Sequence, residues 1–306
     1  MDPGLIKLLK KQGYYTVGEH GAVKLCHWLS ESLLKQRPCY KQLFYGIESH
    51  RCMQVAPGVD LCDQRCLFCW RYYEKESSTV VWDDPQTLLD GFIEGQKKLV
   101  SGFRGDPRCP PKRWEDARNP KHVAISLSGE PTLYPYLNEL LAEISRRDMT
   151  SFLVTNGTMP DALLNLSNLP TQLYITIAAP DEATYQSLCR PSGEYWSKIK
   201  RSLEILSDMK TRKTIRHTLV KGLNMSDIDG YAKLDSMAMP EFIEAKGYVF
   251  VGGSRYRLTI DRMPSHNDVR EFAGGLADRL DYRIFAEDPK SRVVLLVRND
   301  VNSPEL

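Results

Sequence analysis

The stretch CDQRCLFCW, residues 62–70, holds three of the eight cysteines in this chain of 306 residues. Structural zinc sites usually take four ligands from paired CxxC or CxxH units. The CxxxCxxC spacing here provides three cysteines, and no histidine lies within the next fifty positions. Three thiolates on a short loop suit a [4Fe-4S] cube in which the fourth iron is left open to bind another molecule.

Size and composition are those of a folded globular protein. Apolar residues make up 42% and charged residues 26% of the chain, which argues against wholesale disorder and fibrous repeats. No apolar run approaches the roughly 18 residues of a membrane span, and the start MDPGLIKLLKKQGYY lacks the apolar stretch of a signal peptide. We therefore expect a cytoplasmic protein with no membrane partner, in which clustered cysteines bind metal or perform redox chemistry.

Positive charge is concentrated in two segments, although the net charge is only +2. Residues 101–121, SGFRGDPRCPPKRWEDARNPK, contain six Lys or Arg against three acids, and residues 198–216 form a second basic stretch. Such segments can contact the phosphates of a nucleic acid. On charge alone, a solvated surface is the commoner explanation.

Beyond residue 80, apolar strand-like runs alternate with segments of helical periodicity. This alternation predicts an α/β fold with a parallel sheet and right-handed crossovers, either doubly wound or curled into a closed or partial barrel. Strands are expected near residue 55 and over 122–129, 151–157, 172–180, 214–222 and 242–252. Helices are expected over 85–103, 135–147, 161–168, 196–208 and 226–237. The first 50 residues are expected to add a helical layer, and residues 265–298 a helix and a hairpin.

Three short motifs follow the first three expected strands. The cysteine loop follows the first strand, SGEP (128–131) follows the second and TNG (155–157) follows the third. Because parallel strands end at the same edge of a sheet, we expect these motifs to converge on one rim. Taken singly, each has a plain structural explanation, since Gly129 suits a tight turn, Glu130 a helix cap and TNG a turn.

The cysteine spacing, with Phe68 just before the last cysteine, resembles the signature of the radical S-adenosylmethionine superfamily. SLSGEP (126–131) is similar to the segment that holds the methionine end of S-adenosylmethionine there, although Ser128 replaces a common glycine. The resemblance implies that a [4Fe-4S] cluster on Cys62, Cys66 and Cys69 cleaves S-adenosylmethionine to a 5′-deoxyadenosyl radical. It also implies that the cofactor is contacted by residues of the two later motifs, namely Ser128, Gly129, Glu130, Thr155 and Asn156.

A second set of cysteines, Cys26, Cys39 and Cys52, is spaced thirteen positions apart each time, too far for a zinc-finger hairpin. Alone, they would be buried small side chains. However, Cys52 is expected at the start of the strand that leads into the cysteine loop. Cys39 lies in RPCYKQLFYGIESHRCMQ (37–54), which is rich in aromatic and polar residues. A second three-thiolate cluster is therefore the alternative.

Four segments together resemble the stand-alone, archaeal-type tRNA 4-demethylwyosine synthases: VKLCHWL (23–29), CYKQLFYGIESHRCMQ (39–54), CDQRCLFCWR (62–71) and SLSGEPTLYP (126–135). This resemblance extends over nearly the whole chain. It implies a partial (β/α)6 barrel of the radical S-adenosylmethionine type that carries two [4Fe-4S] clusters. It also implies lyase chemistry that joins two carbons of pyruvate to N1-methylguanosine at position 37 of tRNA-Phe, giving tricyclic 4-demethylwyosine.

By position, the same resemblance implies that Cys26, Cys39 and Cys52 hold the auxiliary cluster and that Lys41 forms a Schiff base with pyruvate. A lysine in apolar or cationic surroundings can lose its proton near neutral pH and attack a carbonyl. Electrons would come from a separate flavodoxin-type or ferredoxin-type donor, and a monomer suffices. The chain would form one compact unit with an N-terminal extension, a barrel core and a C-terminal helix and hairpin, over residues 1–50, 51–260 and 261–306.

Contacts with the RNA are expected from basic and aromatic residues. The basic residues of 101–121, together with Arg255, Arg257 and Arg262, would bind phosphates. An extruded base would stack on one of four aromatic residues, Trp70, Tyr72, Tyr73 or Trp196.

Two other functions stay open, and Cys109 and Cys189 receive no role. One is a radical S-adenosylmethionine enzyme that acts on a different substrate, such as a peptide or a lipid precursor. The other is a non-catalytic RNA-binding protein stabilised by metal at its six N-terminal cysteines. That protein would need four-ligand zinc sites, whereas these cysteines group as two triplets.

Overall fold

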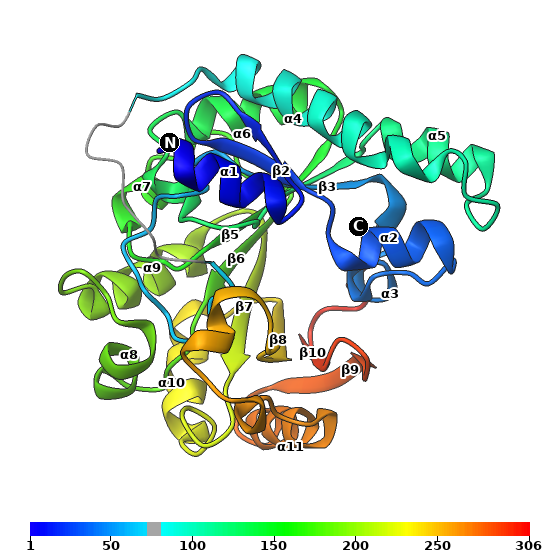
Figure 1. The fold of residues 1–306 in the computed structure, drawn as a ribbon. Helices are drawn as coiled ribbons and strands as arrows, with labels where there is room; N and C mark the ends of the chain where they lie inside the picture. Colours follow the sequence, from blue (N-terminus) through cyan, green and yellow to red (C-terminus); the bar gives the residue numbers. More distant parts are fainter. Residues whose placement is uncertain (72–80) are drawn as a thin grey trace.

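The structure, a computed structural model, describes residues 1–71 and 81–306. Tyr72 and Tyr73, two of the expected stacking residues, lie outside this range. The centre of the fold is a run of six strands, each paired in parallel with the next (Figure 1). These strands are β3 (Cys52–Ala56), β4 (His122–Ile125), β5 (Thr150–Thr155), β6 (Gln172–Thr176), β7 (Arg212–Leu219) and β8 (Phe242–Gly247). They match the six strands expected from the sequence, although most are shorter.

Helices connect the strands and cover one face of the sheet, referred to here as the outer face (Figure 1). The expected helices are present as α4 (Pro85–Val100), α6 (Leu137–Arg146), α7 (Pro160–Leu164), α9 (Trp196–Asp208) and α10 (Ile228–Ala238). Two further helices, α5 (Pro111–Arg118) and α8 (Glu182–Cys189), were not predicted. Leucines such as Leu88 of α4 and Leu203 of α9 pack in one core with the outward side chains of the strands.

Residues 40–47 cover part of the opposite, inner face of the sheet. Helix α3 (Tyr40–Tyr45) begins after Cys39 and ends at Gly46, whose positive φ of 73° suits glycine. Its rings form a second core with inward-facing side chains of the strands, among them Phe152, Tyr174 and Phe242. This packing buries Lys41, the residue between Tyr40 and Gln42, against the inner face of the sheet.

The expected helical layer over residues 1–50 is only partly correct. Helices α1 (Pro3–Lys11) and α2 (His27–Leu34) are present, but a hairpin of β1 (Tyr14–Val17) and β2 (Gly21–Lys24) lies between them. Strand β2 pairs antiparallel with β3 and extends the sheet. Strands of four residues carry too little periodicity to be recognised in a sequence, and pairing with β3 stabilises them here.

The expected C-terminal helix and hairpin are confirmed. They are α11 (His266–Ala277), β9 (Tyr282–Asp288) and β10 (Val293–Arg298). Strand β10 pairs antiparallel with β8, so all ten described strands belong to one sheet in the order β1-β2-β3-β4-β5-β6-β7-β8-β10-β9. The domain limits at residues 50 and 260 stay predictions, since this sheet crosses both. None of the described helices has the length and apolar character needed to cross a membrane.

His122 links the N-terminal segment to the sheet. Its Nε2 atom accepts a hydrogen bond of 3.1 Å from the Glu48 backbone N–H, and its Nδ1 atom lies 2.7 Å from Thr150 Oγ1. An Nε2 atom that accepts carries no proton, so the buried ring is neutral. Burial lowers the pKa of His122 to about 4.

This neutral histidine predicts an acid-sensitive fold. The unfolded chain binds a proton at His122 near pH 6.5 and the folded chain does not, so stability is complete above pH 6.5 and falls toward pH 4. Between pH 7.5 and 5, we expect His122 to account for a loss of about 2 kcal/mol in the free energy of unfolding. Urea titrations of wild type and His122→Gln at both pH values measure this loss in the free energy of unfolding. An equal loss of stability in the two proteins would contradict the prediction.

Candidate active site

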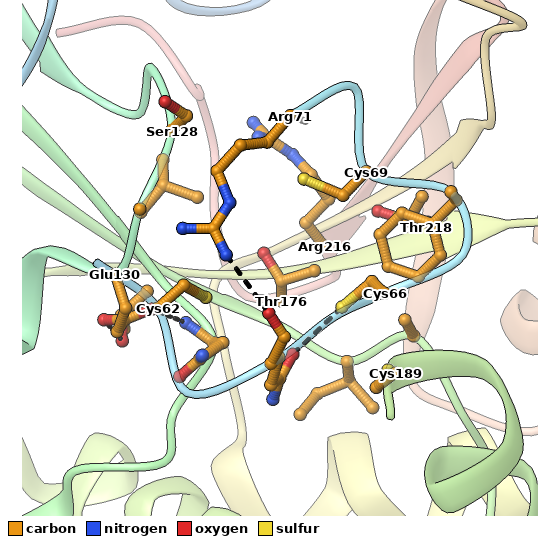
Figure 2. Close-up of a pocket in the computed structure, with 18 of the residues that line it drawn as sticks. Cys62, Cys66, Cys69, Arg71, Ser128, Glu130, Thr176, Cys189, Arg216 and Thr218 are labelled. Carbon is orange, nitrogen blue, oxygen red and sulfur yellow. Dashed lines mark hydrogen bonds between the residues drawn. The ribbon is translucent and has the colours of Figure 1, made fainter. Parts of the chain in front are cut away.

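The three motifs expected on one rim do meet there. Together they line a cavity of about 240 Å³ at the carboxyl ends of the parallel strands (Figure 2). The predicted residues on this cavity are Cys62, Cys66, Cys69, Ser128, Gly129, Glu130, Thr155 and Asn156. Their convergence is confirmed, whereas the role of each residue stays a prediction.

Gly129 allows the cysteine loop to pack against the loop that follows β4. Its φ of +78° is a conformation that favours glycine, and a Cβ atom built there would overlap the Gly58 carbonyl oxygen and lie 2.8 Å from that of Leu61. The next residue, Glu130, donates its backbone N–H to the Leu61 oxygen at 2.7 Å. The glycine is therefore required by close backbone contact with the cysteine loop.

Glu130 ties two of the motifs together. Its carboxylate accepts hydrogen bonds of 2.6 Å from Thr132 Oγ1, 2.6 Å from Thr155 Oγ1 and 2.8 Å from the Asn156 N–H. The Asn156 amide in turn donates to Asp63 of the cysteine loop at 2.7 Å. Burial, followed by the nearby Asp63 charge, raises the pKa of Glu130 to about 7. These contacts connect the rim to the cysteine loop.

The three thiols of the loop face the cavity together with the Arg71 guanidinium (Figure 2). Burial raises the pKa of Cys62, and a hydrogen bond with Cys189 followed by burial raises that of Cys66. Within the described ranges, no three His, Cys, Asp or Glu side chains are grouped to hold a single metal ion. A [4Fe-4S] cube does not require the thiols to converge on one point, because each thiolate binds its own iron.

Several residues of this cavity were not predicted. Arg71 and Cys189 lie beside the three cysteines (Figure 2). Thr176 is the last residue of β6, and Arg216 and Thr218 belong to β7. The strand residues left one signal in the sequence, because Arg216, His217 and Thr218 are consecutive polar residues inside an otherwise apolar strand-like run. Nothing in the sequence near Cys189 indicated that its thiol meets that of Cys66.

Arg257 was expected to bind phosphate and instead holds the cysteine loop. Its guanidinium donates to the carbonyl oxygens of Leu67 and Arg71, both at 3.2 Å, and to that of Cys69. The loop carbonyls therefore occupy this side chain, which corrects the expectation. Arg255 and Arg262 lie farther along the same segment, outside these contacts.

The second set of cysteines is also brought together. Cys26 caps α2, where its Sγ accepts from the Leu29 N–H at 3.3 Å, while Cys39 precedes α3 and Cys52 begins β3. Burial raises the pKa of all three thiols, that of Cys39 to about 12. The Cys26 charge further raises the pKa values of the other two, so the three lie in mutual electrostatic range.

Lys41 lies beside this second set of cysteines. Its Nζ atom is buried without a hydrogen-bond partner among the described residues. It lies 4.2 Å from the centre of the Phe152 ring and 4.5 Å from that of the Tyr174 ring. Burial, with a smaller contribution from Arg216, lowers the pKa of Lys41 to about 8. A substantial fraction of this amine is therefore neutral at physiological pH.

A buried ion pair lies between Lys41 and the cavity of the first cysteines. Arg216 Nη2 lies 2.8 Å from Glu244 Oε2, and Tyr45 Oη donates to Glu244 Oε1 at 2.8 Å. Glu244 counteracts the lowering of the Lys41 pKa, while Arg216 also lines the cavity in Figure 2. Arg216 thus links the two regions, since its guanidinium lies 4.7 Å from the centre of the Tyr174 ring that Lys41 also contacts, and the same side chain lines the cavity of the first cysteines.

Comparison with known proteins agrees with this geometry. Residues 58–234 match the radical SAM superfamily, and residues 237–298 match the family described as wyosine base formation. The S-adenosyl-L-methionine-dependent tRNA 4-demethylwyosine synthase of Pyrococcus abyssi is 49% identical over 99% of this chain and 91% of its own length. The chain belongs to the tRNA 4-demethylwyosine synthase family. Its relative from Methanocaldococcus jannaschii is 39% identical over 95% of both chains.

Solved structures of this synthase family confirm the fold. A structure of TYW1 with a lysine-pyruvate adduct bound superposes with a TM-score of 0.92 at 39% identity, covering 100% of this chain and 99% of that one. A crystal structure of archaeal TYW1 gives 0.83 at 35% identity and covers both chains fully. The partial barrel of the radical S-adenosylmethionine type implied by the sequence resemblance is therefore correct.

Membership of the synthase family implies S-adenosylmethionine and one [4Fe-4S] cluster. The cavity of Figure 2 fits both, since it offers three thiols on one loop beside a rim of backbone and hydroxyl groups. The position of Gly129, where any side chain would overlap the cysteine loop, keeps that rim close to the thiols. The donor set is thus the one that an iron–sulfur cluster with an open iron requires.

Substitution of Gly129 tests whether this close contact supports the cofactor site. In Gly129→Ala, the methyl group forces the cysteine loop away from the rim, so S-adenosylmethionine should bind at least roughly tenfold more weakly. Equilibrium dialysis with the reconstituted protein measures this affinity. Gly102→Ala is the control, because a Cβ atom there meets nothing within 4 Å. Wild-type affinity in Gly129→Ala would show that the rim does not hold the cofactor.

Proposed function

We propose that this chain performs the reaction for which its relatives are named, on N1-methylguanosine at position 37 of tRNA-Phe. Two carbons of pyruvate are added to the methylated base, the C–C bond to the pyruvate carboxylate breaks and that carbon is released, and the tricyclic base 4-demethylwyosine results. The observation that carries this proposal is the Lys41 amine, which is buried without a hydrogen-bond partner among the described residues, within electrostatic range of the three thiols and of Arg216, a residue of the cysteine-loop cavity. Other radical S-adenosylmethionine chemistry does not require such an amine.

Cys62, Cys66 and Cys69 would hold the cluster at which S-adenosylmethionine binds. When bound, this pair supplies a 5′-deoxyadenosyl radical that removes a hydrogen atom from the N-methyl group of the base. The protein's part is to orient the cofactor and to exclude water. Arg257 and Glu130 serve this purpose by fixing the cysteine loop and the rim through the hydrogen bonds described above.

Lys41 would attack the ketone carbon of pyruvate. The neutral amine adds to the carbonyl and water leaves, so that an imine forms. This imine would hold the three-carbon unit at the inner face of the sheet. The Nζ atom of Lys41 lies over the faces of the Phe152 and Tyr174 rings. The Arg216 side chain, with its charge balanced by Glu244, keeps a fixed positive group nearby and favours the unprotonated amine. The structure with a lysine-pyruvate adduct supports this role.

Cys26, Cys39 and Cys52 would hold a second [4Fe-4S] cluster. Their thiols influence one another's pKa, and each thiol must lose its proton to bind iron. Burial raises the pKa of all three thiols, and a charge on Lys41 offsets part of this rise. A cluster at this position would lie beside the pyruvate carried by Lys41.

Basic groups at the surface would hold the RNA. In the segment 101–121, Arg104 and Arg118 lie 5.4 and 4.9 Å from the Trp114 ring centre. Arg108 and Lys112 form surface ion pairs with Asp106 and Asp116, and exposed pairs of this kind are weak enough to exchange for phosphate contacts. Arg255 and Arg262 are further candidates. Trp196, which lines the cavity, stays a candidate for stacking.

The remaining expectations are part of the same proposal. A separate flavodoxin-type or ferredoxin-type donor would reduce the first cluster, and the enzyme would act as a monomer in the cytoplasm. Members such as the rice synthase are longer, and this chain aligns with 46% of that relative.

Trapping of the imine tests Lys41. Borohydride reduction in the presence of labelled pyruvate should label only the peptide that contains Lys41. Labelling should become faster with rising pH and reach half its maximal rate at about pH 8, where half of the amine is neutral. In Lys41→Met, the label should be absent and product formation should fall by roughly a hundredfold or more.

A control variant shows whether the loss of label is specific to Lys41 or follows from the removal of any buried lysine. Lys213 is also buried, where it donates to the Ser207 carbonyl at 3.0 Å, so Lys213→Met should keep the label. Label on Lys213, or full activity in Lys41→Met, would refute the proposed role of Lys41.

Iron counting tests the second cluster. Anaerobically reconstituted wild type should contain about eight irons per chain, and a variant with Cys26, Cys39 and Cys52 changed to Ala about four. Changing Cys109 to Ala should leave the wild-type count, because this buried cysteine lies in an apolar cluster with Leu29 and Leu33. Four irons in both proteins would contradict the proposal of a second cluster. Bound zinc in place of iron would favour a non-catalytic RNA-binding protein.

A further inference from the structure

A second cavity, of about 450 Å³, lies beside the cysteine loop, and among its lining residues the proposed function gives a role to Cys26. Its lining includes Lys24, Cys26, Gln54, Trp70 and Gly252. We propose that this cavity receives the N1-methylguanine base, with Trp70 as its stacking surface and with Lys24 and Gln54 as the groups that recognise its edge. This inference rests on the proposed function, for which it names the substrate-binding site.

The cavity lies between the two sets of cysteines. Cys26 of the second set lines it directly, and Trp70 directly follows Cys69 of the first set. On the other side, Gln54 Nε2 donates to the Ser126 carbonyl at 3.3 Å, and Ser126 lines the cavity of Figure 2. A base that must meet both a radical and the pyruvate carbons needs this intermediate position.

The unpredicted hairpin forms the wall of this cavity. Tyr14 of β1 is directly paired with Lys24 of β2, and Lys24 is directly paired with Gln54 of β3. Paired residues in neighbouring strands project from the same face of a sheet. The three side chains therefore continue the inner face of the sheet on which Lys41 lies, and they form a row from the edge toward the parallel strands.

Trp70 is held in a fixed position, as a stacking surface requires. Its ring stacks on that of Tyr14, with centres 6.1 Å apart and planes at 27°. Its carbonyl oxygen accepts a hydrogen bond of 2.7 Å from the Gly253 N–H, and a Cβ atom at Gly252 would overlap that same carbonyl. Base stacking on a preordered ring avoids the entropic cost of ordering it on binding.

The polar groups of the cavity match the edge of guanine that methylation leaves available. A methyl group on N1 blocks that nitrogen, while O6 and N7 still accept hydrogen bonds and the N2 amino group still donates. Lysine is a common partner of O6 and N7, and the amide of Gln54 can both donate and accept. The Lys24 Nζ atom lies 4.5 Å from the Tyr14 ring centre and 5.0 Å from that of Trp70, so the ammonium group and the stacking surface are adjacent.

Binding of two RNA hairpins tests this site without turnover. One hairpin has the anticodon stem–loop sequence with N1-methylguanosine at position 37, and the other has an abasic residue there. Wild-type holoenzyme, with S-adenosylmethionine and no reductant, should bind the methylated hairpin about tenfold more tightly or better. Trp70→Ala and Lys24→Met should bind the two hairpins with nearly equal affinity. Lys233→Met, on the outer helix α10, is the control and should keep the preference.

Each result bears on the proposal. Lack of a preference in wild type, or its persistence in both variants, would overturn the assignment. A folding defect is excluded by equal iron content and S-adenosylmethionine affinity, and Lys24→Arg, which keeps the charge, should restore part of the preference. Failure of the proposed function has a different signature, namely no tricyclic product from full tRNA, pyruvate and reductant with wild type, whatever the hairpins show.

Discussion

The parallel pairing of β3, β4 and β5 is the constraint on which the candidate site depends. It brings the loops that follow the three strands to one edge, although 57 residues separate the cysteine loop (62–70) from the SGEP loop (128–131). Gly129 then allows backbone to meet backbone, because a side chain there would overlap the Gly58 carbonyl. Without that contact, the thiols and the opposite rim would not enclose one cavity.

A second constraint operates inside the sheet. Helix α3 buries its aromatic side chains against the strands and thereby takes Lys41 out of water. The Arg216–Glu244 pair accompanies it, and breaking one partner of such a buried pair typically costs about 3–5 kcal/mol because the other charge is left alone. Desolvation and a fixed cation act on Lys41 in the same direction, and both lower its pKa. Reactivity and stability therefore depend on the same packing.

Much of this architecture could be predicted from the sequence. The strands of 122–252 are apolar runs between helical segments, and such runs are typical of strands covered on both faces. The cysteine spacing and the SGEP motif predicted a shared rim, which the structure confirms. The hairpin of residues 14–24 was missed because four-residue strands are defined by their partner rather than by their own pattern. The role of Arg257 was misjudged, since a positive charge does not indicate which carbonyls it will meet.

The order of residues along the chain is enough to establish the chemistry that this protein can support: its family, its two cysteine triplets and a lysine two residues after Cys39. These are local properties, because ligand type and spacing depend on a few neighbouring residues. The folded chain is needed to see that Lys41 is buried, that Arg216 and Cys189 share a cavity with the first cysteines, and that Lys24 and Trp70 line another. Burial and contact between distant residues result from the packing of the whole chain, and no single segment encodes them.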